Sequence, residues 1–425
     1  MAQCLNCLIE ALSHFHIYYI CFMPFKNVIA QTETKHHLVD MVQHNRLSHA
    51  LLFLGNEGSG ALPLGIAFAQ YIVCEKANRV RQSSSVTGLF GDEPQPSTID
   101  HRLSSDACGI CSSCIKAQQL VHPDIHFSYP VIPKKSGDKP VSTDYISEWR
   151  EFISLYPYGN SFDWLQFIGA ENKQGNITAS ECSDIIRKLN LKSFESGYKI
   201  LIMWMPEYLG NEGNKLLKLI EEPPPNTLFI LIAENESLIL PTIISRTQLV
   251  KIPSLDTKDI EDALIERAKI AADKARQVAS ISEGNYREAL QLLQNAEQDW
   301  QGLLRDWLNT ILKTGPTAQV KWIDEVSKLG REKQKQFLRY FNHLLEQAIR
   351  LRVMDEQSLN IPDNEKDFAL RLNKIADISQ QQAIIEQLDK AAYYIERNAH
   401  AKMLFHALTI KLYHIIANKT VAVVN

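Results

Sequence analysis

Three cysteines in a short run could hold a metal ion. Cys108, Cys111 and Cys114 are each separated by two residues, and thiolates at this spacing suit the tetrahedral coordination of Zn²⁺. The alternatives are three free buried thiols or an iron–sulfur cluster. A site closed by four thiolates has no open coordination position, so such a zinc would be structural. His122 and His126 follow the run, and we expect them in a loop or at a strand edge rather than on the metal.

A glycine-rich segment has the context of a phosphate-binding loop. Gly55, Gly58 and Gly60 lie between an apolar run and an expected helix, where glycines let backbone N–H groups face a phosphate. The lysine that would carry positive charge is replaced by Ala61, and the hydroxyl that would bind Mg²⁺ by Leu62. Two interpretations stay open: the glycines only form a turn, or the loop binds a nucleotide weakly through its backbone. Hydrolysis is not expected in either case.

Apolar runs around these motifs predict an open α/β sheet. Buried strands are expected at His49–Leu54, Ile200–Met205 and Leu228–Ala233, with a shorter strand at Gln248–Ile252. A helix is expected over Leu209–Glu222, because the three prolines that follow must end it. This alternation of strands and helices is typical of a parallel sheet covered by helices.

Length and composition limit the class of protein. The 425 residues are enough for about two to four domains. A net charge of −4 and a pI near 6.4 argue against a protein that grips DNA by itself over a broad basic face. Eight cysteines with a packed cluster indicate a reducing compartment, and no apolar run reaches the roughly 18–20 residues of a membrane helix. Residues 1–22 lack Lys and Arg, so we expect a start at Met23 or an ordinary local helix rather than a secretory signal.

Several stretches resemble the clamp-loader branch of the AAA+ ATPases. They are CGICSSCIKAQQLVHPDIHFSYPV, NKLLKLIEEPPPNTLFIL, TIISRTQ and SEGNYREALQLL. In that family an acidic pair, which handles Mg²⁺, stands where this chain has Trp204 and Met205. The family's Ser-Arg-Cys motif corresponds to Ser245, Arg246 and Thr247. A chain that lacks the two carboxylates but keeps the arginine resembles the delta-prime branch of the bacterial DNA polymerase III clamp loaders.

The resemblance implies a domain plan. An AAA+ sheet domain of the P-loop type would cover residues 23–253, with a zinc module at about 74–120 that contains a flexible insertion at 75–107. A small helical lid would follow at 254–297 and an all-α collar domain, in which the subunits join, at 298–425.

The resemblance also implies roles for single residues. Cys74 would be the fourth zinc ligand, beside the three clustered cysteines. Arg246, with Ser245 in its motif, would act in trans as an arginine finger in the ATP site of an adjacent subunit. The alternative is a surface arginine paired with a local carboxylate. Arg287 stands at the position of the lid arginine that contacts nucleotide, and we expect it to be structural here because its own site lacks the Mg²⁺ chemistry.

For the whole chain, the resemblance implies a cytoplasmic subunit without ATPase activity that completes a heteropentamer with delta and three gamma/tau subunits. That complex would load the beta sliding clamp onto primed DNA during replication, using ATP bound by the neighbouring subunits, with no membrane partner. One alternative is an active gamma/tau-type ATPase, against which Ala61, Leu62, Trp204 and Met205 argue. The other is a zinc-containing nucleic-acid adaptor, which the acidic pI disfavours.

Overall fold

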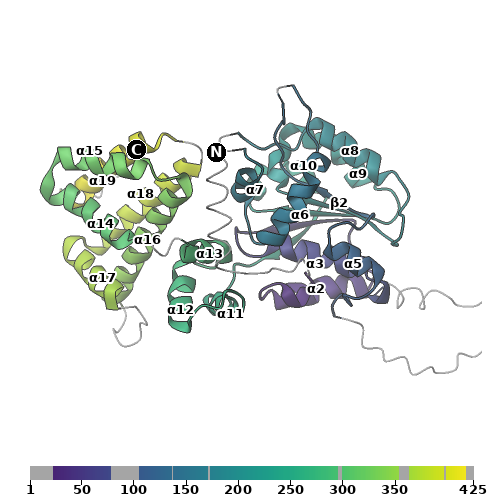
Figure 1. The fold of residues 1–425 in the computed structure, drawn as a ribbon, viewed down its shortest axis with the longest axis horizontal. Coiled ribbons are helices and arrows are strands. Elements are labelled where there is room, and N and C mark those ends of the chain that lie inside the picture. The colour runs from purple at the N-terminus through teal and green to yellow at the C-terminus, as the bar shows by residue number, and fades with distance from the viewer. Residues whose placement is uncertain are drawn as a thin grey trace, which may run out of the picture. The chain divides into compact units, whose positions relative to one another are not determined.

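The computed structural model describes most of the chain (Figure 1). The described residues are 23–77, 105–135, 137–170, 173–294, 299–353, 363–396 and 399–417. The extension 1–22 and most of the expected insertion 75–107 therefore lie outside them. The chain forms two compact units, Met1–Leu290 and Gln291–Asn425. None of the described helices combines the length and the apolar character needed to cross a membrane.

The first unit is built on a five-stranded parallel sheet. Its strands lie in the order β2-β3-β4-β1-β5, and every neighbouring pair is parallel. The strands are β1 (Ala50–Gly55), β2 (Ile125–Ser128), β3 (Lys199–Trp204), β4 (Thr227–Ala233) and β5 (Gln248–Ile252). The α/β class predicted from the apolar runs is confirmed. The central strands are almost entirely apolar because both faces of the sheet are covered.

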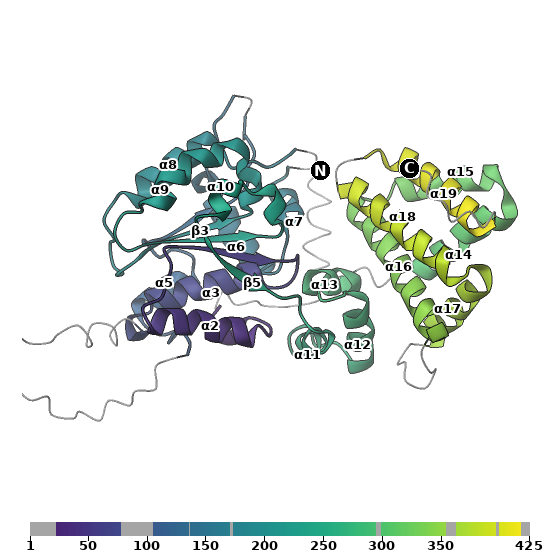
Figure 2. The ribbon, with the colours of Figure 1, turned by 180° about the vertical axis from the view of Figure 1, so that it is seen from behind.

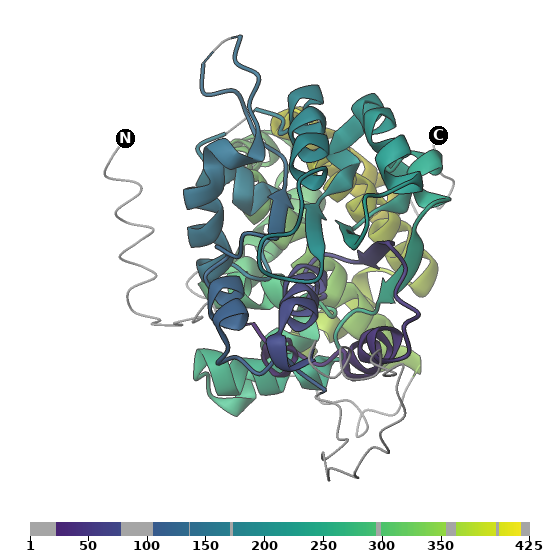
Figure 3. The same ribbon diagram turned by 90° about the vertical axis from the view of Figure 1, so that its right-hand side faces the viewer.

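Helices form a layer on each face of the sheet. One core, which includes Phe53, is shared with α2 (Thr32–Gln43), α3 (Ala61–Val73), α6 (Ile146–Leu155) and α7 (Ser161–Phe167). The opposite core, which includes Leu52, is shared with α8 (Ala179–Leu189), α9 (Leu217–Glu221) and α10 (Pro241–Ile244). Figure 2 shows α8, α9 and α10 on one side of the strands and α2 and α3 on the other. The purple α2–α3 region also lies below the strands in the side view of Figure 3.

One local expectation is wrong. The segment predicted as a single helix over 209–222 is mostly a 3₁₀ helix, η3 (Pro206–Leu216), and only α9 is α-helical. The helix is interrupted at Gly210, which has φ 49° and ψ −142°. Glycine has a poor helix propensity, and Gly210 and Gly213 together leave this segment without a strong preference for the α conformation.

Short helices follow the sheet. They are α11 (Thr257–Ala268), α12 (Ala272–Ile281) and α13 (Tyr286–Gln294). The turn before α13 is held to the end of the sheet, because Leu255 N–H donates to the Gly284 carbonyl at 3.2 Å. Gly284 has φ +87°, and an added Cβ would lie 2.9 Å from the Leu255 carbonyl oxygen. Glycine is therefore required at this turn.

All the regular elements described in the second unit are helices, as predicted for the C-terminal region. After Asp299 it contains α14 (Trp300–Asn309), a π-helical turn (Thr310–Thr314), α15 (Pro316–Ser327), α16 (Arg331–Val353), α17 (Asp363–Ile375), α18 (Ile378–Glu396) and α19 (Ala401–Ala417). Its core is aromatic at one end, where the Trp307 and Trp322 rings stack at 4.7 Å and contact Phe405.

Candidate functional site

The glycine-rich loop between β1 and α3 is a tight strand-to-helix turn. Gly58 and Gly60 have φ values of 71° and 90°, which residues with a Cβ avoid. A Cβ on Gly58 would also lie 1.9 Å from the Asn285 side-chain oxygen. At Gly55 a Cβ would lie 2.7 Å from the Cβ of Ile252. All three glycines are thus required by the local packing, whether or not the loop meets a phosphate.

The hollow beside this loop is nearly filled. Ala61 and Leu62, which replace the lysine and the hydroxyl of a working loop, are 8% and 4% exposed. Trp204 and Met205 line the same hollow, whose volume is about 20 Å³. This is room for roughly one water molecule. Aromatic and thioether groups therefore stand where Mg²⁺-binding carboxylates would be needed.

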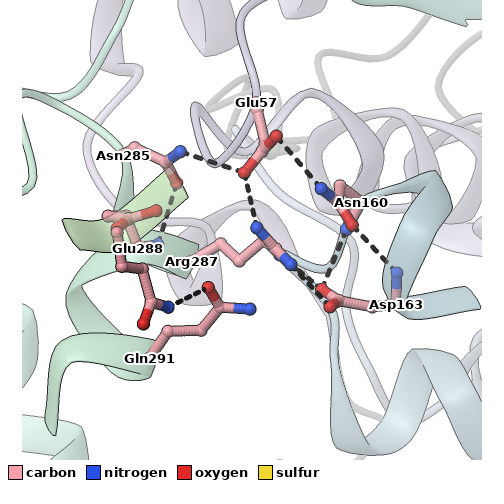
Figure 4. Close-up of polar contacts among 8 residues, drawn as sticks. Glu57, Asn160, Asp163, Asn285, Arg287, Glu288 and Gln291 are labelled. Carbon is pink, nitrogen blue, oxygen red and sulfur yellow. Dashed lines mark hydrogen bonds and ion pairs between the residues drawn. The ribbon is translucent and has the colours of Figure 1, made fainter. Parts of the chain in front are cut away.

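Arg287 is buried against the loop (Figure 4). Its Nη1 donates to Glu57 Oε1 at 2.7 Å, while its Nε and Nη2 donate to the two carboxylate oxygens of Asp163 at 2.5 and 2.7 Å. The arginine side chain is 4% exposed. A guanidinium that bonds a carboxylate through two parallel donors makes a strong charge-assisted contact. One cation therefore joins the loop, α7 and α13.

Two asparagines complete the network in Figure 4. Asn160 and Asn285 donate through their side-chain amides to the two oxygens of Glu57, at 3.0 and 3.2 Å. The Asn160 oxygen accepts the Asp163 backbone N–H at 2.9 Å and caps α7. The positive charge of Arg287, which would face a phosphate in a nucleotide site, is thus satisfied by carboxylates of the same chain.

The partners of Arg287 were not predicted from the sequence. Glu57 lies in the variable part of the loop, and Asp163 is more than a hundred residues away along the chain. The one local signal is the spacing of Asn160 and Asp163, which form a capping box. That pattern predicts the start of a helix, not an ion pair with a distant arginine.

The structure brings the four predicted cysteines together. The Sγ atoms of Cys74, Cys108, Cys111 and Cys114 all lie within 4.8 Å of one another, and those of Cys108 and Cys114 are 3.9 Å apart. Four sulfurs at 2.3 Å from a tetrahedral Zn²⁺ would be roughly 3.8 Å from one another. Cys74 ends α3, and the other three lie before and within α5 (Ser112–Gln118). The cluster could therefore bind a metal ion.

Backbone hydrogen bonds favour negative charge on two of the four sulfurs. The backbone N–H of Cys108 donates to the Cys74 sulfur and that of Cys114 to the Cys111 sulfur, each at 3.4 Å. A hydrogen bond from the Cys114 thiol lowers the pKa of Cys74, and the same bond raises the pKa of Cys114. The thiols thus share protons that a cation would replace, which fits a site for a thiolate-bound metal.

Arg246 lies at the surface after α10 and is paired locally. Its guanidinium contacts the Glu221 carboxylate, with Nε donating at 2.6 Å. Nη1 donates to the Thr242 carbonyl at 2.8 Å and contacts the Ser245 hydroxyl at 3.2 Å. The arginine side chain is 33% exposed. The side chain therefore adopts the locally paired arrangement and remains accessible from outside the chain.

Comparison with known proteins identifies the family. A family model described as DNA polymerase III, delta subunit, matches residues 30–89 and 95–256, which is more than half of the chain. The chain belongs to this family. The matched region contains the strands of the sheet, the glycine loop, the cysteine cluster and Arg246. The resemblance to the delta-prime branch noted from the sequence is confirmed at the level of the family.

The chain is also similar to individual subunits of bacterial DNA polymerase III. The delta′ subunit of DNA polymerase III from Bacillus subtilis is 27% identical over 260 residues, covering 61% of this chain and 58% of the relative. The tau subunit from the same organism is 24% identical over 339 residues, covering 78% of this chain and 48% of the relative. The chain thus spans about half the length of these relatives. A solved gamma subunit-related protein from Thermotoga maritima is 15% identical with a TM-score of 0.36, covering 89% of this chain and 98% of that one.

Proposed function

We propose that this chain is a delta-prime subunit of a DNA polymerase III clamp loader and has no ATPase activity of its own. It would assemble with delta and gamma/tau subunits into a heteropentamer that loads the beta sliding clamp onto primed DNA. The observation that carries the proposal is the filled phosphate-loop site. Ala61, Leu62, Trp204 and Met205 occupy the positions of its reactive groups beside a hollow of about 20 Å³.

The chemistry of phosphoryl transfer supports this assignment. Such catalysis is almost entirely positioning and charge stabilisation, by a lysine, a metal ion and its oxygen ligands. Replacement of these groups by apolar ones removes the charge stabilisation, whatever the backbone of the loop still contacts. ATP would then act in the neighbouring subunits and not in this one. The similarity to tau makes an active gamma/tau-type ATPase the second candidate, which these four residues disfavour.

The Arg287 network gives the inactive site a structural role. In an active subunit, a bound nucleotide would contact both the loop and the lid. Hydrolysis of the nucleotide would break the connection between them. Here Glu57 and Asp163 bind Arg287 within the chain, so the connection needs no nucleotide. The subunit would therefore keep one arrangement of sheet and lid through the ATP cycle and act as a rigid partner.

Arg246 would contribute to the ATP site of an adjacent subunit. Its guanidinium is accessible, and its present partner Glu221 has a side chain that is 45% exposed. An exposed ion pair is worth only about 0–1 kcal/mol, so a transferring phosphoryl group could displace Glu221 at small cost. Arg246, with Ser245 in its motif, would then stabilise charge in the transition state in trans.

The remaining assignments follow the same family plan. The four cysteines would hold a structural Zn²⁺ in a module at about 74–120 of an AAA+ sheet domain at 23–253. Residues 254–297 would be the lid and 298–425 the collar in which subunits join. The protein would act in the cytoplasm. Zinc would supply a crosslink between the end of α3 and α5, with no catalytic part.

Clamp loading by a reconstituted complex tests the proposal. The complex is made from delta, gamma/tau and the beta clamp of the same organism, with and without this chain, and clamps on primed DNA are counted. We expect the chain to co-purify with the other subunits, to hydrolyse no ATP in isolation and to be required for loading. Failure to assemble would overturn the assignment, and ATP hydrolysis by the isolated chain would favour the gamma/tau alternative.

A further inference from the structure

A second cavity lies at the free edge of the sheet, beside β2 and α6. Its volume is about 160 Å³. It is lined by residues 120–123 and 125–127, by Thr143 of η2 (Ser142–Tyr145), by Ile146 and Arg150 of α6, and by Lys188 of α8. Because β2 is the first strand in the sheet order, no further strand of the described part of the chain covers this edge. The cavity has room for a small polyatomic ligand and belongs to neither site described above.

His122 places an unsatisfied donor in the wall of this cavity. Its side chain is buried at 3% exposure, and its Nδ1 accepts the backbone N–H of Asp124 at 3.1 Å. The proton of the neutral ring is therefore on Nε2. That Nε2 has no hydrogen-bond partner among the described residues. A buried donor without an acceptor is unfavourable, so the ring is suited to a ligand that brings an acceptor.

Two cationic side chains line the same cavity. Arg150 is positioned by its Nε, which donates to the Leu120 carbonyl at 3.1 Å, and this leaves the two Nη groups to bind a ligand. Lys188 contacts the Thr143 hydroxyl at 2.7 Å and pairs with Asp184 at 2.7 Å. No acidic side chain is among the described residues that line the cavity. The buried carboxylate of Asp124 accepts hydrogen bonds from three backbone N–H groups.

We propose that this cavity is a binding site for one small oxyanion group, a phosphate or a carboxylate. Arg150 would bind two oxygens of the group through its Nη donors, in the bidentate geometry that guanidinium favours. His122 would donate to a third position through Nε2–H once its ring turns toward the ligand, because Nε2 has almost no accessible surface in this structure. Lys188 would add positive charge. The lining is otherwise largely apolar and includes no carboxylate among the described residues, so the two cations favour an anionic ligand over a cation.

The test is a titration of the full chain with inorganic phosphate and, separately, with sodium acetate at constant ionic strength. The readout is the imidazole signals of ¹³C-labelled histidines, with His122→Phe used to assign the signal of His122. Arg150→Met removes the bidentate donors, and Lys188→Met removes charge without touching the buried ring. Arg371→Met, on the exposed surface of α17, is the matched control.

We expect saturable shifts of the His122 signal with at least one of the two anions. Arg150→Met should weaken that binding by about tenfold or more, and Lys188→Met by a smaller factor because its charge is shared with Asp184. Arg371→Met should bind as the unchanged chain does. Saturation by phosphate alone would assign the site to a dianion, and saturation by both to any carboxylate or phosphate group. Absence of saturable shifts, or equal binding by both cavity variants and the unchanged chain, would overturn the proposal.

Discussion

Arg287 is the side chain that connects the first turn of α13 to the glycine loop. Its three donors are matched by Glu57 and Asp163, and the group is almost entirely shielded from water. A buried ion pair adds little compared with a well-packed apolar group, but removal of one partner is costly because the other charges stay buried and unpaired. Removal of Arg287 should therefore lower the free energy of unfolding by more than the intact ion pairs add to it.

Replacing Arg287 by methionine should destabilise the first unit. The change leaves Glu57 and Asp163 facing each other without a cation, and we expect a loss of about 3–5 kcal/mol in the free energy of unfolding. Urea unfolding followed by the fluorescence of the tryptophans in the sheet unit measures this. Arg276→Met is the matched control, because Arg276 lies on α12 with a side chain that is 51% exposed and pairs with Glu261. Its effect should stay below about 1 kcal/mol, and an equal effect for both variants would contradict the buried-pair interpretation.

His126 gives a pH-dependent contribution to stability. Burial lowers the pKa of His126 from 6.5 to about 4, with Lys188 adding to the shift and Asp124 opposing it. The unfolded chain therefore binds more protons than the folded chain between these values, so this contribution to stability is lost as pH falls from about 6.5 to about 4. We expect His126→Gln to flatten the dependence of the unfolding midpoint on pH across that window. His37→Gln, on the exposed face of α2, should leave the dependence unchanged, and a slope unaffected by His126→Gln would contradict this account.

At the scale of elements, the cysteine cluster joins the end of α3 to α5. The four sulfurs come from segments separated by more than thirty residues, and a metal would crosslink them. If the ligands are thiolates, metal binding and folding of this module are coupled. The free energy of binding would then appear as stability of the module.

Zinc should be present at about one ion per chain and lost on substitution of the cluster. We expect Cys111→Ser to abolish the bound zinc and to lower the thermal midpoint of the sheet unit, measured by elemental analysis and differential scanning calorimetry. Cys182→Ser is the control, because Cys182 is a buried free cysteine of α8 outside the cluster. Full zinc content in Cys111→Ser, or none in the unchanged chain, would be the contradicting results.

The features that could be predicted from the sequence are those that depend on residues close together along the chain. Strands β1, β3 and β4 contain apolar runs between turn signals, so their positions could be predicted to within a few residues. The cysteine cluster could be predicted because three of its ligands are adjacent along the chain. The 3₁₀ helix before α9 could not be predicted, because Gly210 interrupts a segment whose leucines still have helical spacing. The partners of Arg287 could not be predicted either, because Glu57 and Asp163 are distant in the sequence and contact Arg287 only in the folded chain.

At the scale of the whole molecule, the proposed function is that of a subunit that supplies a fixed surface and an arginine, and does not itself hydrolyse ATP. The loop site is nearly filled, and α13 is joined to it by side chains of the same chain, while Arg246 remains accessible at the surface. These features would let the chain present one fixed surface to a neighbour during cycles of ATP binding and hydrolysis elsewhere. Family membership and this arrangement together predict that the arginine acts on a site that the chain itself does not contain.

The most direct measurement is ATP hydrolysis, stimulated by DNA and clamp, in a complex reconstituted with delta and gamma/tau. It compares the unchanged chain with Arg246→Ala, and with Arg276→Ala as a control on a different exposed arginine. An arginine finger is worth about 10³–10⁵ in rate at a single site, so we expect Arg246→Ala to assemble normally and to lose most of the hydrolysis at the adjoining site. Arg276→Ala should retain full activity. A complex with Arg246→Ala that hydrolyses ATP as fast as the unchanged complex would contradict the central claim and leave Arg246 as the partner of Glu221 alone.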